Sequence, residues 1–161
     1  MLKYIGAALI LLLAFYLSRE HKKEVEKRLG EGEACLLFMK SLRREVGCFL
    51  RPISEWARGY GSTCPGLLSL ISRLRSGMSL GDAYGEIEDG LCLSPSAKRS
   101  FSSFCTSFGK GYMEDELRMA DAHISQLELC LEGERAEGAR QCRLVSTLSV
   151  ASSFAIVILL I

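Results

Sequence analysis

Residues 93–109, LSPSAKRSFSSFCTSFG, decide the fold class of this 161-residue chain. Ser94 has the side chain of a helix N-cap, and Pro95 suits the first helical position because the N–H group that it lacks would have no partner there. Apolar side chains then recur at the i, i+3, i+4, i+7 spacing of one helix face: Phe101, Phe104, Cys105 and Phe108. The stretch predicts a helix whose aromatic face is buried in a core.

Short helices are predicted on the N-terminal side of this stretch as well. The segment PISEWARGY predicts one that ends at Gly59 or Gly61, and Ser79 with Asp82 resembles a capping pair. Between them, CPGLLSLISRLRSG predicts a helix that stops at Gly77 and buries four residues: Leu67, Leu70, Ile71 and Leu74. No stretch shows the sustained alternation of strands, so the predicted fold class is all-α.

A long helix is predicted in the C-terminal third of the chain. Its start, Glu114-Asp115-Glu116, places carboxylates at the positive end of a helix dipole. An apolar seam follows at three- and four-residue spacing: Leu117, Ala120, Ile124, Leu127 and Leu131. No proline occurs after this start, so we expect a continuous helix of roughly 50 residues, about 75 Å long, with Gly133 and Gly138 as the places where it flexes.

Another long helix is predicted from about Glu20 to Phe49. Its buried face consists of Cys35, Phe38 or Met39, Leu42, Val46 and Phe49. Gly30 and Gly32 each cost about 1 kcal/mol relative to alanine in a helix interior. They therefore predict a bend or a break in this helix.

Both chain ends, residues 1–18 and 144–161, are apolar. The second has no charged residue, and the first has only Lys3. Roughly 20 helical residues cross a bilayer core of about 30 Å, with about 17 as the lower limit. We expect two membrane-spanning helices at these ends and a helical domain at residues 19–143. The alternatives are a cleaved signal peptide at the first end and a buried core helix at the second.

The charged flanks of the two apolar ends predict their orientation. Basic residues gather on the inner side of both: Arg19, Lys22, Lys23, Arg140 and Arg143. The positive-inside rule then puts residues 19–143 in the cytoplasm and both termini across the membrane. Free thiols agree with this location, since the cytoplasm keeps cysteines reduced.

Composition argues against several classes of function. The segment from Ser18 to Arg143 holds all 19 acidic residues and every basic residue except Lys3, so its formal charge is zero. Nucleic-acid-binding domains usually carry a basic excess, and we therefore predict no nucleic-acid partner. The 7 cysteines are odd in number and include no C-x-x-C pair, and neither histidine has a cysteine or another histidine at helical ligand spacing. We predict reduced cysteines, most of them buried, and no metal site.

Candidate catalytic residues lack supporting context. FGKGYME (108–114) matches neither a dinucleotide-binding fingerprint nor a P-loop. The acidic stretches GEIEDG (85–90) and MEDE (113–116) have the oxygen ligands of a hard cation, but solvated helix ends explain them more simply. His123 as a base for a cysteine is less favoured than His123 as a surface or packed residue. We predict no catalytic residue and no cofactor.

Four stretches, taken in order, resemble one protein family: LRREVGCFLRPISEWA, LRSGMSLGDAY, LSPSAKRSFSSFCTSFGKGY and AIVILLI. They resemble the stage III sporulation protein AB family of endospore-forming bacteria, across essentially the whole chain. That family is similar in turn to the cytoplasmic domain of type II secretion system protein F, a bundle of about six helices with a recurring glycine, short turn and helix start. Gly77-Met-Ser-Leu-Gly-Asp-Ala fits this pattern, and Arg51-Pro-Ile-Ser-Glu-Trp-Ala fits it loosely.

The resemblance implies a non-catalytic platform in the channel complex that joins mother cell and forespore during engulfment. The implied location is the mother-cell membrane around the forespore. The implied partners are other stage III sporulation proteins and a cytoplasmic ATPase resembling stage III sporulation protein AA, and a homo-oligomer stays open. We expect the ATPase to contact polar residues of the cytoplasmic domain: Arg43, Arg44, Arg51 and Glu55. An ordinary solvated helix face is the alternative for these four residues.

Two other classes of function remain open from the sequence. A membrane-tethered adaptor for another cytosolic partner would share every physical feature of the chain. A membrane enzyme that uses cysteine or histidine chemistry is less favoured. Alanine replacement at His123 and at each cysteine separates the enzyme from the platform.

Overall fold

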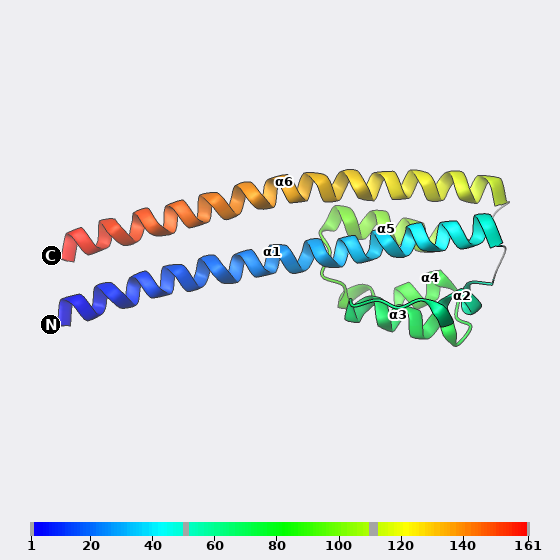
Figure 1. Cartoon of the computed structure of the whole chain (residues 1–161), viewed down its shortest axis with the longest axis horizontal. Coiled ribbons are helices and arrows are strands. Elements are labelled where there is room, and N and C mark those ends of the chain that lie inside the picture. Colours follow the sequence, from blue (N-terminus) through cyan, green and yellow to red (C-terminus); the bar gives the residue numbers. More distant parts are fainter. Residues whose placement is uncertain (1, 50–51, 110–112, 161) are drawn as a thin grey trace. The chain divides into compact units, whose positions relative to one another are not determined.

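The structure, a computed structural model, describes residues 2–49, 52–109 and 113–160. Within its two long helices, side chains are described for residues 12–13, 15–16, 18–45, 114–148, 151 and 155. The described residues form six α-helices and one 3-10 helix, without a strand among them (Figure 1). The elements are α1 (Leu2–Phe49), α2 (Ile53–Gly59), α3 (Pro65–Arg75), α4 (Leu80–Gly85), η1 (Glu88–Gly90), α5 (Pro95–Ser107) and α6 (Met113–Leu160). The predicted all-α class is confirmed.

The chain divides into two compact units. Unit 1 comprises Met1–Lys27 and Gly133–Ile161, and unit 2 comprises Arg28–Glu132. Unit 2 holds the short helices and the parts of α1 and α6 that pack with them. The expected domain boundaries at 18/19 and 143/144 fall inside α1 and α6.

The predicted starts and ends of the short helices are confirmed. The Ser94 hydroxyl accepts a hydrogen bond from the Ala97 N–H at 3.2 Å. Ser79 caps α4 in the same way, and its hydroxyl also donates to the Asp82 carboxylate at 2.6 Å. Gly77 has φ of 90° directly after the C-cap of α3, a conformation that glycine adopts without a steric cost.

The core of unit 2 is built around aromatic rings from α1, α2 and α5. Phe38 is fully buried and meets three rings edge-on, with centroid distances of 5.3 Å to Trp56, 5.8 Å to Tyr60 and 6.0 Å to Phe101. Such pairs add about 0.5–1.5 kcal/mol each to the burial of their area. All four predicted residues of α3 are buried, and so are the three of α5 and its C-cap residue Phe108. The apolar periodicity read from the sequence therefore identifies the core.

Helix α1 continues through Gly30 and Gly32, so the predicted break is wrong. A Cβ atom on Gly32 would clash with the Leu131 side chain of α6, whereas one on Gly30 would meet nothing within 4 Å. Within unit 2, Gly32 thus permits a close approach of two helices. The glycine costs helix propensity, and the packing of the buried Leu131 offsets that cost.

Helix α6 is also continuous over its 48 residues, as predicted. Neither Gly133 nor Gly138 interrupts it. Within unit 1, a Cβ atom on Gly138 would lie 2.7 Å from Val25 Cγ1, so this glycine too permits a close helix contact. The continuity of α6 through both glycines is therefore compatible with tight packing at Gly138.

The expected membrane spans at residues 1–18 and 144–161 consist largely of residues whose side chains lie outside those described. Among the described residues, no helix has a stretch long and apolar enough to cross a membrane.

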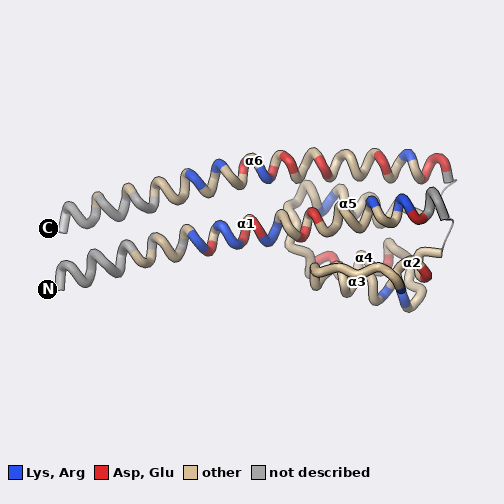
Figure 2. Tube along the Cα trace, viewed as in Figure 1, with Lys and Arg blue, Asp and Glu red and all other residues tan. Residues whose placement is uncertain are grey.

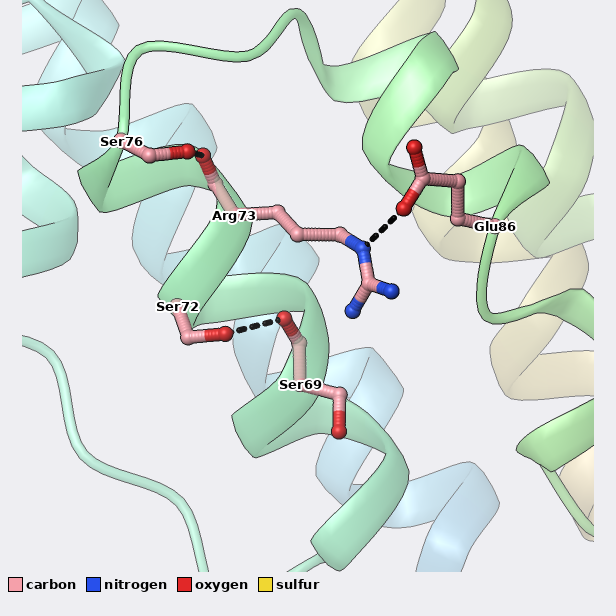
Figure 3. Close-up of polar contacts among 5 residues, drawn as sticks. All are labelled: Ser69, Ser72, Arg73, Ser76 and Glu86. Atoms are coloured by element: carbon pink, nitrogen blue, oxygen red, sulfur yellow. Dashed lines mark hydrogen bonds and ion pairs between the residues drawn. The ribbon is translucent and has the colours of Figure 1, made fainter.

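Polar contacts join α2, α3 and the segment after α4 at the surface of unit 2. Arg73 of α3 donates to Glu86 at 2.6 Å, and the hydroxyls of Ser72 and Ser76 bond back to carbonyls of their own helix (Figure 3). Arg75 donates from Nε to the Ala57 carbonyl at 2.8 Å and from Nη2 to the Tyr60 carbonyl at 3.0 Å. Arg75 thereby pairs backbone acceptors at the end of α2, which have no partner within that helix.

Candidate functional site

A surface groove runs between α1 and α2 in unit 2. It consists of two adjoining hollows of about 380 and 400 Å³ that share three lining residues. We call it the α1–α2 groove and define it by the residues that line either hollow: Leu37, Lys40, Ser41, Arg44, Glu45, Glu55, Trp56, Gly59 and Tyr60. Both hollows are open to solvent, so the groove suits part of a macromolecule better than an enclosed small ligand.

The wall of the groove on the α2 side is aromatic and fixed in place. The rings of Trp56 and Tyr60 lie 4.7 Å apart, and both contact the buried Phe38. The Trp56 indole donates to the Ser41 hydroxyl at 3.3 Å, which ties α2 to α1. Burial raises the pKa of the Tyr60 phenol, with a smaller contribution from Cys35. This phenol therefore stays protonated at neutral pH and can donate a hydrogen bond to a partner.

The charges of the groove differ between its two hollows. One hollow has Lys40 and Arg44, and the other has Arg44 with Glu45 and Glu55. Lys40 forms an ion pair with Glu128 of α6, with 2.5 Å between nitrogen and oxygen. Within the described part of the chain, Arg44 and Glu55 have no ion-pair partner. Two of the four sequence-predicted contact residues, Arg44 and Glu55, are thus brought to one hollow with their charges available.

Of the other two predicted contact residues, Arg43 does not line the groove. Arg43 Nη2 lies 2.8 Å from Asp121 Oδ2 of α6, so Arg43 joins two helices of unit 2. A charge reversal at Arg43 would place two acidic groups together and would confound any test of docking. Arg51 lies outside the described residues.

Sequence reasoning missed the apolar part of the groove. Leu37 is 62% exposed, although its neighbour Phe38 is fully buried. Its position was a usable signal, because it is out of phase with the buried face of α1. The contributions of Ser41 and Tyr60 depend on the packing of α2 against α1, and no local pattern indicates that packing.

The cysteines of unit 2 are poorly suited to nucleophilic chemistry. The six cysteines with described side chains are free thiols, and Cys35, Cys64 and Cys105 are buried. Burial raises the pKa of the Cys35 thiol, assisted by Cys64 and Glu31. Burial likewise raises the pKa of the Cys105 thiol. Because the thiolate is the reactive form, both thiols stay protonated at neutral pH and are poor nucleophiles.

The remaining candidates for chemistry have ordinary structural surroundings. His123 is half-buried on α6, and burial lowers its pKa. The acidic stretch 85–90 is matched by basic groups: Glu86 pairs with Arg73, and Glu88 and Asp89 lie 3.5 and 3.7 Å from Lys98. In the described ranges, no cluster of three or more histidine, cysteine or acidic side chains is arranged to hold a metal ion.

Comparison with known proteins decides the family. The model of the family described as stage III sporulation protein AB matches residues 3–161. The chain belongs to the stage III sporulation protein AB family. Comparisons with curated proteins and with solved structures gave no match. Membership of this family assigns the chain to stage III of sporulation, and the resemblance read from the sequence is confirmed.

Proposed function

We propose that the chain is a non-catalytic membrane platform in a secretion-like channel complex between mother cell and forespore, and that it docks a cytoplasmic secretion-type ATPase. The observation that supports this proposal is the α1–α2 groove, where Arg44 and Glu55 flank the aromatic wall of Trp56 and Tyr60. Neither Arg44 nor Glu55 has an ion-pair partner among the described residues. Protein interfaces are enriched in tyrosine, tryptophan and arginine, which this groove combines.

Contact positions on two different helices support docking at this groove. Arg44 lies on α1 and Glu55 on α2, yet both line one hollow. The exposed Leu37 gives the adjoining hollow an apolar surface that a partner side chain would cover. A partner segment with an apolar anchor, an acidic group for Arg44 and a basic group for Glu55 would complement the groove.

Membrane anchoring is part of the proposal, with residues 1–18 and 144–161 as the anchors, unit 2 in the cytoplasm and both termini outside. Large apolar side chains are exposed in unit 1 wherever the structure describes them near the chain ends: Leu12, Leu13, Phe15, Tyr16, Leu144 and Leu148. Phe15 is 68% exposed and Leu148 63%. Contact with lipid would remove these surfaces from water.

A likeness of unit 2 to the cytoplasmic domain of type II secretion system protein F is the corresponding proposal for the fold. The recurring glycine and turn before α4, with Gly77 in the left-handed region, supports it. Other stage III proteins and further copies of this chain are the proposed neighbours in the complex.

Co-purification tests the proposed function. The full chain, tagged within its cytoplasmic domain, is recovered from membranes of sporulating cells as the wild type and with Arg44→Glu or Glu55→Lys. The matched control is Arg99→Glu, which reverses an exposed arginine of α5 outside the groove. We expect the wild type and the control to recover the ATPase, and each groove variant to recover at least about fivefold less, as for the loss of a 1 kcal/mol contact.

The two parts of the proposal fail in different ways. Equal recovery by all four proteins would remove the groove as the docking site and keep the platform. Absence of any ATPase from the wild-type preparation would contradict the platform and favour the tethered adaptor.

A further inference from the structure

Five exposed basic residues of unit 1 lie at similar levels along α1 and α6, near the chain ends. They come from α1 and α6 and are named here the basic belt: Arg19, Lys22, Lys23, Arg140 and Arg143. In Figure 2 the coloured charged residues nearest the chain ends lie on α1 and α6 at the same end of unit 1.

The two helices bring the belt residues to one level. Within unit 1, α1 and α6 run antiparallel, with both termini at one end (Figure 1), and they touch where Val25 faces Gly138. Helical residues rise about 1.5 Å each, so Lys23 and Arg140 lie about 3 Å beyond this contact towards the chain ends, and Arg19 lies about 9 Å beyond it. The other two belt residues fall between these levels. Five cations therefore occupy a band little more than one helical turn deep.

Few acidic groups neutralise the belt. Glu20 is the one acidic residue in the two stretches 19–23 and 139–143, and its carboxylate pairs with Lys23 at 2.9 Å. Lys22 lies 3.7 Å from Glu26, one turn further from the chain end. Arg19, Arg140 and Arg143 have no ion-pair partner in the described ranges. The belt thus keeps an excess of positive charge directed towards solvent.

The residues directly beyond the belt are apolar or interfacial. Tyr16 is 59% exposed one turn before Arg19, and Leu144 is 52% exposed directly after Arg143. A tyrosine and an arginine at the boundary of an apolar segment are typical of a helix where it passes the headgroups of a bilayer. A soluble protein partner would require neither the apolar side chains nor their position beyond the cations.

We propose that the basic belt binds the headgroups of anionic phospholipids and selects them over zwitterionic ones. This inference rests on the proposed membrane anchoring, because anchoring places the belt at the headgroup level. The guanidinium groups of Arg140 and Arg143 offer planar, bidentate donors to a lipid phosphate. A polybasic segment gains roughly fivefold in affinity for an anionic surface with each cation placed near it.

Lipid titration of the full chain tests the belt. The protein in non-ionic detergent is titrated with dioleoylphosphatidylglycerol and, separately, with dioleoylphosphatidylcholine, and bound lipid is counted by native mass spectrometry. The test variant is Arg140→Gln/Arg143→Gln, and Arg58→Gln/Arg99→Gln removes the same charge from exposed positions of unit 2. We expect the wild type and the control to prefer phosphatidylglycerol, and the test variant to lose about 25-fold of that preference.

Added salt and phosphate define the ligand further. The preference of the wild type for phosphatidylglycerol over phosphatidylcholine should decrease as the ionic strength rises, since exposed charges are screened beyond about 10 Å at 0.1 M salt. Inorganic phosphate at matched ionic strength should not displace the lipid. Equal binding of the two lipids by the wild type, or equal loss in the test and control variants, would overturn the inference.

A separate measurement distinguishes the belt from the anchor. Membranes that contain the chain are washed with alkaline carbonate, which releases proteins that do not penetrate the bilayer. Retention of the chain with no lipid preference would keep the anchor and overturn the belt. Release of the chain with the preference intact would overturn the anchor and support the belt as a peripheral contact.

Discussion

At the scale of single residues, the Arg75 side chain connects α3 to the end of α2 through two backbone carbonyls. Its guanidinium donates to the carbonyls of Ala57 and Tyr60, which end α2. Hydrogen bonds from charged groups contribute about 1.5–3 kcal/mol each, and removal of the donor leaves the carbonyls to find other partners. Arg75 is thus a stability residue although it lies on an exposed helix face.

Arg75→Ala should lower the free energy of unfolding by about 1–3 kcal/mol. Urea unfolding of the full chain in detergent, followed by circular dichroism at 222 nm, measures this change. Arg73→Ala is the matched control, because the exposed Arg73–Glu86 pair is a surface ion pair that contributes about 0–1 kcal/mol. Equal losses of unfolding free energy in the two variants would show that the carbonyl contacts of Arg75 stabilise the fold no more than a surface ion pair does.

The half-buried His123 should make stability depend on pH. Burial lowers its pKa in the folded chain, so the unfolded chain, in which the pKa is near 6.5, binds the proton more tightly. His123 therefore leaves the free energy of unfolding unaffected at pH values above the unfolded pKa of about 6.5, and the free energy of unfolding falls as the pH decreases below that pKa. His123→Gln should flatten the dependence between pH 7 and pH 5 relative to His21→Gln. An unchanged slope would assign the dependence to other groups.

Residue-scale features that depend on nearby sequence could be predicted. Ser94, Ser79 and Gly77 act on groups within a few positions of themselves, so their roles follow from local spacing. The role of Arg75 could not be predicted, since its acceptors lie 18 and 15 residues away and are main-chain atoms that every residue has. Arg43 was assigned to docking for the same reason, because its partner Asp121 is 78 residues away.

At the scale of elements, the two glycines of α1 in unit 2 have opposite surroundings. Gly30 has open space where a side chain would start, and Gly32 faces Leu131. Sequence rules treat both as helix breakers, because propensity reports the glycine alone and not its neighbour on another helix. Whether such a glycine only weakens the helix or also permits a close helix contact depends on the neighbouring residue.

Leucine at each position separates the two roles. Gly30→Leu should raise the free energy of unfolding by about 0.8 kcal/mol through helix propensity. Gly32→Leu gains the same propensity but overpacks against Leu131, which costs about 1–3 kcal/mol, so a net loss is expected. Thermal unfolding followed by circular dichroism compares the pair. A gain in both variants would mean that α1 and α6 separate without cost at Gly32.

At the scale of the whole molecule, the proposed orientation predicts which side of the membrane exposes unit 2. Trypsin added to intact spheroplasts should leave the chain whole, and trypsin added after permeabilisation should cut at exposed basic residues such as Arg58 and Arg99. Fragments identified by mass spectrometry report the cleavage sites. Cleavage at Arg58 in intact spheroplasts would reverse the orientation.

The α1–α2 groove shows which features of a surface can be predicted from the sequence at this scale. The resemblance led to Arg44 and Glu55, and the structure places both in one hollow. The aromatic wall was not predicted, since it exists only where α2 lies against α1. The exposed Leu37 was missed, although its phase on α1 was a usable signal. Local pattern predicts the elements, and a surface made by two elements needs their packing.

Because unit 1 consists of two separate stretches of the chain, the ribosome completes it only after it has made all of unit 2. Its first part ends at Lys27, and its second begins only at Gly133. A ribosome that adds about 5–20 residues per second leaves a delay of roughly 5–20 s between the two parts. Throughout this interval the first part of unit 1 lacks its second part, while unit 2 is complete once Glu132 has emerged. The beginning of the chain is therefore the last region to reach its final neighbours.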